Sequence, residues 1–355
     1  MACRRLRRPQ PEMVARPCPQ PGDAFRTPGP SPMIGLMKIV VTHCEAGSGL
    51  AWQRALAQRL PHAKIGLDRG SPDGAASAEP GLTSDATLAV GWKPAPDFFA
   101  RHPALRAFFS CGAGVDHLLA HPGLPASLPL YRLEDAGMGA YMADYCLHEL
   151  LRLLSREEAY ATQQRQQHWQ EQPWLTRAEL PVGIVGMGVL GEQVARALMA
   201  QGFAVRGFAR TARTVQGIEV MAGTADWPHF LAATRVLILL APHTRATENL
   251  IDATALSALQ PGAWLINVAR GALVVDDALI AALDRGQLAG ATLDVFRQEP
   301  LPAAHPFWHH PRIRITPHIS GPTQVAQSAR QVADKMTLLA QGAVPSGRVN
   351  PDTGY

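Results

Sequence analysis

Three glycines in the stretch VGIVGMGVLGEQVARAL, residues 182–198, constrain the fold of this chain more than any other feature. Gly186, Gly188 and Gly191 form the pattern G-x-G-x-x-G directly after an apolar run and directly before an amphipathic stretch. In a strand-turn-helix unit the first glycine makes the tight turn, the second lets a pyrophosphate approach the backbone, and the third allows close helix-strand packing. The pattern therefore predicts a βαβ unit that binds a dinucleotide, the alternative being glycines that serve only a tight turn.

The end of the next apolar run, AVRGFA, carries no acidic residue. An Asp or Glu at this point binds the ribose 2′-hydroxyl of NAD in many dinucleotide-binding folds. Here Ala209 holds the position, and Arg210 and Arg213 follow it. Because a guanidinium matches a phosphate with two parallel hydrogen bonds, the sequence favours NADPH, with NADH bound more weakly. The alternative is that both arginines are solvated surface residues.

The order of apolar runs predicts two α/β domains. From Met37, short apolar runs alternate with amphipathic stretches, and we expect 104–119 to be one of these stretches. A second series of apolar runs follows. A single long helix is expected over 139–168, and Pro173 forbids its continuation. A last amphipathic segment, 323–342, has room to fold back on the first unit.

We therefore expect an α/β fold with two doubly wound parallel sheets. A substrate domain is expected over 37–136 and 320–355, and a dinucleotide-binding domain over 137–319. Residues 1–36 are rich in proline and arginine and show no apolar periodicity, so we expect a disordered tail. An organellar transit peptide, or an upstream start codon before a true start at Met33 or Met37, are the alternatives for this tail.

Charge and hydropathy exclude two classes of partner. The first 35 residues carry six arginines against Glu12 and Asp23, which accounts for the whole net charge of +4. The remainder is close to neutral, which argues against a nucleic-acid-binding surface, and no window approaches the roughly 18 apolar residues of a membrane span.

Five cysteines lie scattered without a C-x-x-C pair, which indicates reduced thiols and a cytoplasmic location.

Three charged residues, Arg270, Glu299 and His318, each follow an apolar run of the second series. Ligands of open α/β sheets bind beyond the carboxyl ends of the strands, so these side chains are expected near one site. An arginine clamp for a carboxylate, a proton donor, and a group that keeps the donor protonated are what reduction of a 2-oxo acid requires. Taken singly, each has a structural alternative: a helix-capping arginine, a turn glutamate and a core histidine.

At these residues the chain resembles the D-2-hydroxyacid dehydrogenase family, and within it the glyoxylate/hydroxypyruvate reductase A group. The resemblance covers 37–355 and rests on GAGVDHL, DAGMGAYMADY, the glycine loop, NVARGALV, LDVFRQEPLP and TPHIS, in the family's order. It implies a Rossmann dinucleotide-binding domain inserted in a flavodoxin-like substrate domain, and a homodimer. For the dimer, HWQEQPW, residues 168–174, is a candidate interface element, the alternative being aromatic packing at a helix end.

The resemblance also implies roles for individual residues. Arg270 would orient the carboxylate and carbonyl of the substrate, His318 would protonate the carbonyl oxygen, and Glu299 would hydrogen-bond His318. The backbone N–H groups of Ala113 and Gly114 would hold the substrate carboxylate. The implied cofactor-binding residues are Gly186, Met187, Gly188, Val189, Leu190, Gly191, Arg210, Arg213, Ala241, Pro242, Val268, Ala269 and Asp294, the last at the nicotinamide carboxamide.

Two further sets of residues have open interpretations. Trp92 either lines the substrate pocket, as the resemblance implies, or is a buried core tryptophan. His305, His309 and His310 lack the carboxylate or cysteine spacing of a metal site, so we expect no metal.

The expected activity is NADPH-dependent reduction of a small 2-oxo acid, glyoxylate or hydroxypyruvate, with hydride from the nicotinamide and a proton from His318. The alternatives are a cofactor-sensing, corepressor-like binding protein and a reductase of a larger 2-oxo acid.

Overall fold

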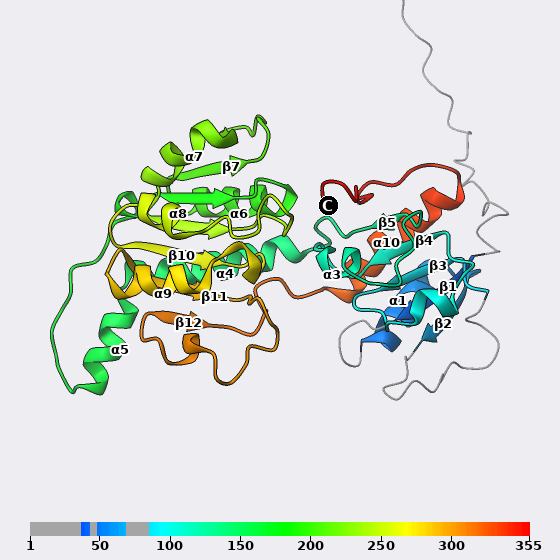
Figure 1. Ribbon diagram of the computed structural model, residues 1–355, viewed down its shortest axis with the longest axis horizontal. Helices are drawn as coiled ribbons and strands as arrows, with labels where there is room; N and C mark the ends of the chain where they lie inside the picture. Colours follow the sequence, from blue (N-terminus) through cyan, green and yellow to red (C-terminus); the bar gives the residue numbers. More distant parts are fainter. Residues whose placement is uncertain (1–36, 43–47, 69–84) are drawn as a thin grey trace, which may run out of the picture.

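Two parallel β-sheets organise the computed structural model, which describes residues 37–42, 48–68 and 85–355 (Figure 1). The strand order is β2-β1-β3-β4-β5 in the first sheet and β12-β11-β10-β9-β6-β7-β8 in the second. Every strand pairing in both sheets is parallel. The expected α/β fold with two doubly wound parallel sheets is confirmed. The expected tail over 1–36 lies outside the described residues.

The first sheet has the strand order of flavodoxin-like folds. Its strands are β1 (Lys38–Thr42), β2 (Lys64–Asp68), β3 (Leu88–Gly91), β4 (Ala107–Ser110) and β5 (Leu130–Tyr131). The expectation of an amphipathic stretch over 104–119 was wrong in its first half. The residues AFFS form strand β4 between β3 and β5, and all four are buried because Ala107 and Phe109 pack in one apolar cluster and Phe108 in another on the opposite face.

The second sheet has Rossmann topology, with β6 at its centre. Its strands are β6 (Val182–Val185), β7 (Val205–Ala209), β8 (Glu219–Ala222), β9 (Val236–Leu239), β10 (Ala263–Asn267), β11 (Leu288–Leu293) and β12 (Ile313–Ile315). The chain proceeds outward through β7 and β8 on one side of β6, then resumes at β9 on the other side. The switch point of the strand order therefore lies beside the glycine loop, where open α/β sheets bind ligands.

Helices connect the strands in both units. They are α1 (Gly49–Arg59), α2 (Phe98–Arg101), α3 (Asp116–Leu119), α4 (Met138–Leu154), α5 (Glu157–Arg165), α6 (Val189–Ala200), α7 (Gly223–Ala232), α8 (Ala253–Ala258), α9 (Asp276–Asp284) and α10 (Val325–Ala340). Short 3₁₀ turns occur at Arg177–Glu179, Gly271–Leu273 and Pro306–His309. No helix in the described ranges is both long enough and apolar enough to cross a membrane.

The single long helix expected over 139–168 is instead two helices, α4 and α5. Between them Arg156 has a left-handed backbone with φ 57°, which ends the hydrogen-bond ladder of α4. The buried guanidinium of Arg152 also pairs with Glu157, at 3.0 Å, and with Glu158. These ion pairs draw the start of α5 back onto α4, which apolar periodicity alone does not reveal.

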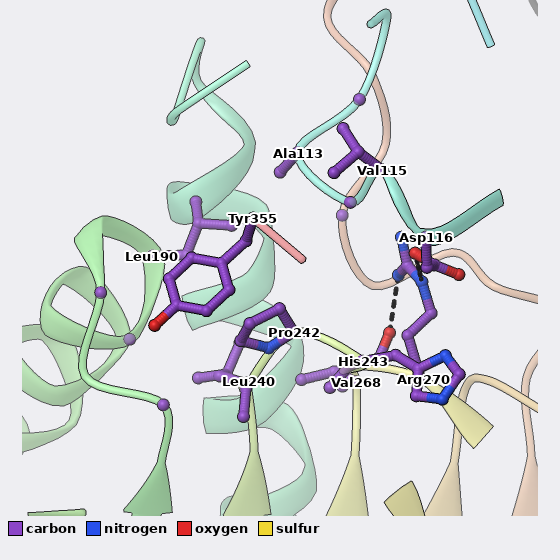
Figure 2. A pocket seen from close by; sticks show the side chains of 18 of the residues that line it. Ala113, Val115, Asp116, Leu190, Leu240, Pro242, His243, Val268, Arg270 and Tyr355 are labelled. Atoms are coloured by element: carbon purple, nitrogen blue, oxygen red, sulfur yellow. Dashed lines mark hydrogen bonds and ion pairs between the residues drawn. The ribbon is translucent and has the colours of Figure 1, made fainter. Parts of the chain in front are cut away.

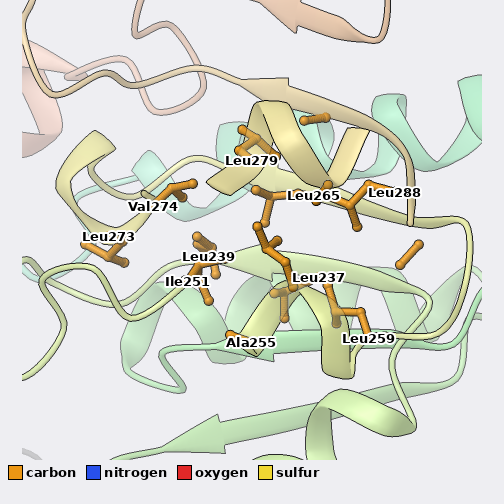
Figure 3. Packing of buried hydrophobic residues seen from close by; sticks show 14 of the residues in the cluster. Leu237, Leu239, Ile251, Ala255, Leu259, Leu265, Leu273, Val274, Leu279 and Leu288 are labelled. Atoms are coloured by element: carbon orange, nitrogen blue, oxygen red, sulfur yellow. The ribbon is translucent and has the colours of Figure 1, made fainter. Parts of the chain in front are cut away.

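Each sheet has its own apolar core. In the second unit, Leu237 of β9 and Leu265 of β10 pack with Leu279 of α9 in a fully buried cluster (Figure 3). In the first unit, α10 contributes its apolar face to the core beneath α1 and β1, although it follows the second unit in sequence. The chain consequently passes between the units twice, at the start of α4 and again before α10 (Figure 1).

Candidate active site

One large cavity lies where loops of both units meet. Its volume is about 1460 Å³, more than the 300–1,000 Å³ of typical small-molecule sites, so it has room for a dinucleotide beside a small substrate. The loops at the carboxyl ends of β3 and β4 form one wall, and those at the carboxyl ends of β6, β7, β9 and β10 form the other. Both sheets thus direct their ligand-binding edges at the same space.

The glycine loop shows three different reasons for glycine. Gly186 has φ 104°, and a Cβ there would collide with the backbone of Ala241. A Cβ on Gly191 would collide with the carbonyl of Gly186, so this glycine lets α6 approach β6. Gly188 has an ordinary extended backbone, and a Cβ there would find no atom within 4 Å. Its surface is open toward the cavity, as the approach of a ligand requires.

The two arginines after β7 have different surroundings. Ala209 is the last residue of β7, as the sequence predicts, and Arg210 follows it into the cavity wall. Arg213 turns back to the glycine loop, where it donates a hydrogen bond to the carbonyl of Met187 and lies 3.3 Å from Glu192. Arg210 makes no hydrogen bond or ion pair with any residue that the structure describes. Of the two, Arg210 is the one whose N–H groups are available to an anion.

His318 and Glu299 form a pair on the same cavity. The Nδ1 atom of His318 lies 2.8 Å from Oε2 of Glu299, and Oε1 accepts a hydrogen bond of 2.9 Å from the Phe296 amide. Burial by itself would raise the pKa of Glu299, but the hydrogen bonds from His318 and Phe296 hold it below its ordinary value. Glu299 is therefore an anion at neutral pH, and Nε2 is the ring nitrogen that remains for a ligand.

Asp294 holds the segment that carries His318. This carboxylate is fully buried and accepts hydrogen bonds from the amides of Ile319 and Ser320, at 2.9 and 2.8 Å, and from the Thr316 hydroxyl. His318 has a left-handed backbone with φ 55°, which a residue with a Cβ adopts at a cost. The hydrogen bonds to Asp294 offset that cost and keep the imidazole at the cavity.

Arg270 reaches from the second unit to the first. Its Nε lies 3.0 Å from Oδ1 of Asp116, at the start of α3, and Nη1 donates to the Ala269 carbonyl at 2.7 Å. Figure 2 shows the guanidinium of Arg270 directly beside the carboxylate of Asp116. Although burial would raise the pKa of Asp116, the Arg270 guanidinium holds it below its ordinary value. The remaining N–H groups of Nη1 and Nη2 form an edge that a carboxylate can meet.

The loop GAGVD shapes the wall opposite His318. A Cβ on Gly114 would collide with Nη2 of Arg270, so only glycine lets the guanidinium lie against this loop. A Cβ on Gly112 would likewise collide with the ring of Trp92. Trp92 packs against His117 with ring centroids 4.0 Å apart, and it lines the cavity while also touching the first core. Burial lowers the pKa of His117 to about 4, so the imidazole beside Trp92 is neutral.

The structure brings nearly all the candidate residues to this one cavity. They are Trp92, Ala113, Gly114, Gly186, Met187, Gly188, Val189, Leu190, Gly191, Arg210, Arg213, Ala241, Pro242, Val268, Ala269, Arg270, Glu299 and His318. The exception is Asp294, which lies behind the wall, so its contact with a carboxamide stays a prediction.

Among the wall residues that the sequence did not single out, Asp116 and Tyr355 make the contacts most important to the site. Asp116 had a usable signal, since it directly follows GAGV. Tyr355 had none, because its approach to the glycine loop depends on the path of the whole chain (Figure 2).

The histidines near residue 305 do not come together. His305 lies 3.4 Å from Asp276, and His310 lies 3.4 Å from Asp284. Over 37–42, 48–68 and 85–355, no group of three histidine, cysteine or acidic side chains has the arrangement of a metal site.

The cavity fits a dinucleotide on three observations. Open space lies over Gly188, the twelve-residue helix α6 begins at the next residue with no side chain capping its first N–H groups, and Arg210 stands at the end of β7. The region around Arg270 and His318 can clamp a carboxylate and deliver a proton to a neighbouring oxygen. Together these features suit hydride transfer to the carbonyl group of a small acid.

Known proteins are similar to this chain in both sequence and fold. The family model described as "D-isomer specific 2-hydroxyacid dehydrogenase, NAD binding domain" matches residues 147–320. A glyoxylate/hydroxypyruvate reductase A from Serratia proteamaculans is 41% identical over 309 residues, 86% of this chain and 96% of that protein. One from Yersinia enterocolitica is 40% identical with the same coverage.

Two crystal structures extend the comparison. A D-isomer specific 2-hydroxyacid dehydrogenase from Xanthobacter autotrophicus, in complex with NADPH and MES, has a TM-score of 0.84 and 35% identity. An NADPH-dependent glyoxylate/hydroxypyruvate reductase from Sinorhizobium meliloti, in complex with NADP and sulfate, has a TM-score of 0.81 and 32% identity. Each alignment covers 90% of this chain and 100% of the other.

Because Gly186 and Gly188 have different surroundings, an added methyl group is expected to lower the stability of the protein at Gly186 and to weaken dinucleotide binding at Gly188. Gly186→Ala is expected to destabilise the protein by at least about 1 kcal/mol, or roughly 2–4 °C in Tm, because its backbone is left-handed and its space is filled. Gly188→Ala is expected to leave Tm unchanged and to weaken dinucleotide binding, because its methyl group would project into the cavity. Thermal unfolding without ligand, then titration with NADPH, measures both. A lowered Tm for Gly188→Ala would contradict the open position of this residue.

Proposed function

The chain belongs to the D-isomer specific 2-hydroxyacid dehydrogenase family, and from this we propose that it reduces glyoxylate or hydroxypyruvate to the 2-hydroxy acid with NADPH. The observation that carries the proposal is the meeting of His318, Glu299 and Arg270 on the cavity that also contains the glycine loop. Relatives at about 40% identity are named glyoxylate/hydroxypyruvate reductase A, and a structural neighbour is NADPH-dependent.

The proposed mechanism assigns each group one task. Bound NADPH supplies the hydride, which the carbonyl carbon of the 2-oxo acid accepts. The free edge of Arg270 binds the substrate carboxylate against the GAGVD loop, where the amides of Ala113 and Gly114 add to the clamp. His318 donates the proton from Nε2 to the carbonyl oxygen. Glu299 holds Nδ1 and stabilises the imidazolium that must be present before the transfer.

The cofactor would be held by the second unit. The pyrophosphate would lie over Gly188 and the first turn of α6, where N–H groups and the helix dipole favour negative charge. The 2′-phosphate would meet Arg210, because Ala209 neither accepts hydrogen bonds from a 2′-hydroxyl nor repels a phosphate. Arg213 would contribute less, because its guanidinium is engaged by Met187 and Glu192.

Trp92 supports a small substrate over a larger 2-oxo acid. Its ring lies against Gly112, next to the loop where the carboxylate would bind. The neutral His117, whose ring is tilted by 46° against the indole, holds the ring in this position. A substrate with a short side chain fits beside the indole without moving it.

We propose a homodimer in which residues 168–174 contact the partner, because Trp169 is 99% exposed and Trp174 is 68% exposed rather than packed at a helix end. A cytoplasmic location is proposed from the scattered cysteines.

Replacement of Glu299 tests its role beside His318. Glu299→Gln keeps the size of the side chain but removes the charge that pairs with Nδ1, so we expect kcat/KM for glyoxylate to fall about tenfold or more while the Kd for NADPH stays nearly unchanged. Glu219→Gln, outside the cavity, serves as control. An unchanged kcat/KM in Glu299→Gln would remove Glu299 from this role.

Replacement of Arg270 tests the carboxylate clamp. A lysine presents one ammonium rather than a planar fork, so Arg270→Lys is expected to lower kcat/KM for glyoxylate at least tenfold. The Kd for NADPH, measured by calorimetry, is expected to stay nearly unchanged. Arg206→Lys is the matched control, because Arg206 pairs with Glu219 outside the cavity. An equal loss of cofactor binding would place Arg270 at the cofactor instead.

The cofactor preference tests the end of β7. We expect kcat/KM with NADPH to exceed that with NADH by about tenfold, the size of an exposed charge-assisted contact. The double variant Ala209→Asp, Arg210→Ala is expected to lower this ratio by a similar factor, because it adds a repelling carboxylate and removes the guanidinium. If the parent prefers NADH, or the ratio does not fall, then neither residue selects the cofactor.

A further inference from the structure

The last residues of the chain cross from the first unit to the cofactor side of the cavity. Residues 347–349 run antiparallel to β5. The Arg132 amide donates a hydrogen bond to the Gly347 carbonyl at 2.9 Å, and the Val349 amide donates one to the Leu130 carbonyl at 2.8 Å. Val349 is buried in a core cluster of the first unit, so this segment is firmly anchored. Figure 1 shows the end of the segment between the two units.

A closed turn then directs Tyr355 into the cavity. The Gly354 amide donates to the Asn350 carbonyl at 2.9 Å, and the Asn350 amide donates to the main-chain oxygen of Tyr355 at 3.2 Å. Gly354 has φ 81°, and a Cβ there would lie only 3.2 Å from Thr244, in the loop after β9. The turn therefore touches the second unit directly, and glycine permits the approach.

The ring of Tyr355 lies against Arg210. The guanidinium carbon of Arg210 is 5.1 Å from the ring centroid, within the range of a cation–π contact. The ring also lies near Leu190 and Pro242, which line the same cavity (Figure 2). An arginine from the second unit is thus held by a tyrosine from the first.

A contact through the flat face of the guanidinium leaves the phosphate-binding edge of Arg210 free. A guanidinium has a flat face, which stacks on an aromatic ring, and an edge of N–H groups, which forms paired hydrogen bonds with a phosphate. The ring and a phosphate therefore do not compete for the same side of the group. An otherwise exposed arginine also loses less conformational freedom on binding when a neighbour already restricts it.

We propose that Tyr355 is a positioning residue for cofactor selection, which orients Arg210 toward the 2′-phosphate of NADPH. The proposal rests on the proposed function, because it requires Arg210 to face that phosphate. It predicts that the ring raises affinity for NADPH and leaves affinity for NADH unaffected through this contact. A cation–π contact at an exposed site corresponds to about a two- to fivefold change in Kd.

Binding measurements on the full chain test the proposal. Tyr355→Leu keeps apolar bulk near Leu190 and Pro242 but removes the π face, and Tyr355→Phe keeps the face. The Kd for NADPH and for NADH, measured by calorimetry, should show a ratio about two- to fivefold less favourable to NADPH in Tyr355→Leu and unchanged in Tyr355→Phe. Thermal unfolding checks that both variants are folded.

A double-mutant cycle isolates the contact. In an Arg210→Ala background, Tyr355→Leu is expected to have no further effect on the ratio of the two Kd values. An effect that persists in that background, or a Tyr355→Leu change of equal size for both cofactors, would overturn the proposal. A parent protein that does not bind NADPH more tightly than NADH would instead count against the cofactor of the proposed function, so the two failures are distinguishable.

Discussion

The ion pair between Arg270 and Asp116 joins the two halves of the site. Arg270 follows β10 of the second sheet and Asp116 begins α3 of the first, so the pair connects elements that share no core. Both groups are partly buried, and loss of either would leave the other charge poorly compensated. Gly114 is the steric condition for this contact, because any side chain there would displace the guanidinium. The position of the substrate clamp, Arg270, relative to the proton donor, His318, depends on this ion pair.

Sequence reasoning succeeded where local pattern determines structure. The glycine loop, the apolar runs and the order of motifs indicated the strands of the second sheet except the edge strand β8, which has no fully buried residue, and the residues at their carboxyl ends. In parallel sheets these ends share one edge, so Arg270, Glu299 and His318 could be expected near one another from the sequence alone. Ala209 could be placed at the end of β7 for the same reason.

The rest required tertiary information. The break between α4 and α5 depends on ion pairs to the buried Arg152, which periodicity does not encode. The hydrogen bonds by which buried Asp294 holds the His318 segment had no signal in the sequence, while its expected contact with a carboxamide stays a prediction. Tyr355 reaches the cavity only because residues 347–349 are anchored beside β5. For Asp294 and Tyr355 the deciding partners lie far along the chain or across the molecule.

The position of α10 in the chain has a consequence for biosynthesis. Ala329, Val332 and Met336 complete the apolar core of the first unit, together with Trp52 and Leu56 of α1. Every strand of the second sheet leaves the ribosome before α10 does. Domains generally fold from the N-terminus onward during synthesis, but here the first unit lacks one wall of its core until the end of translation. The first unit can therefore complete its core only after the whole second sheet has been synthesised, although its own strands begin the chain.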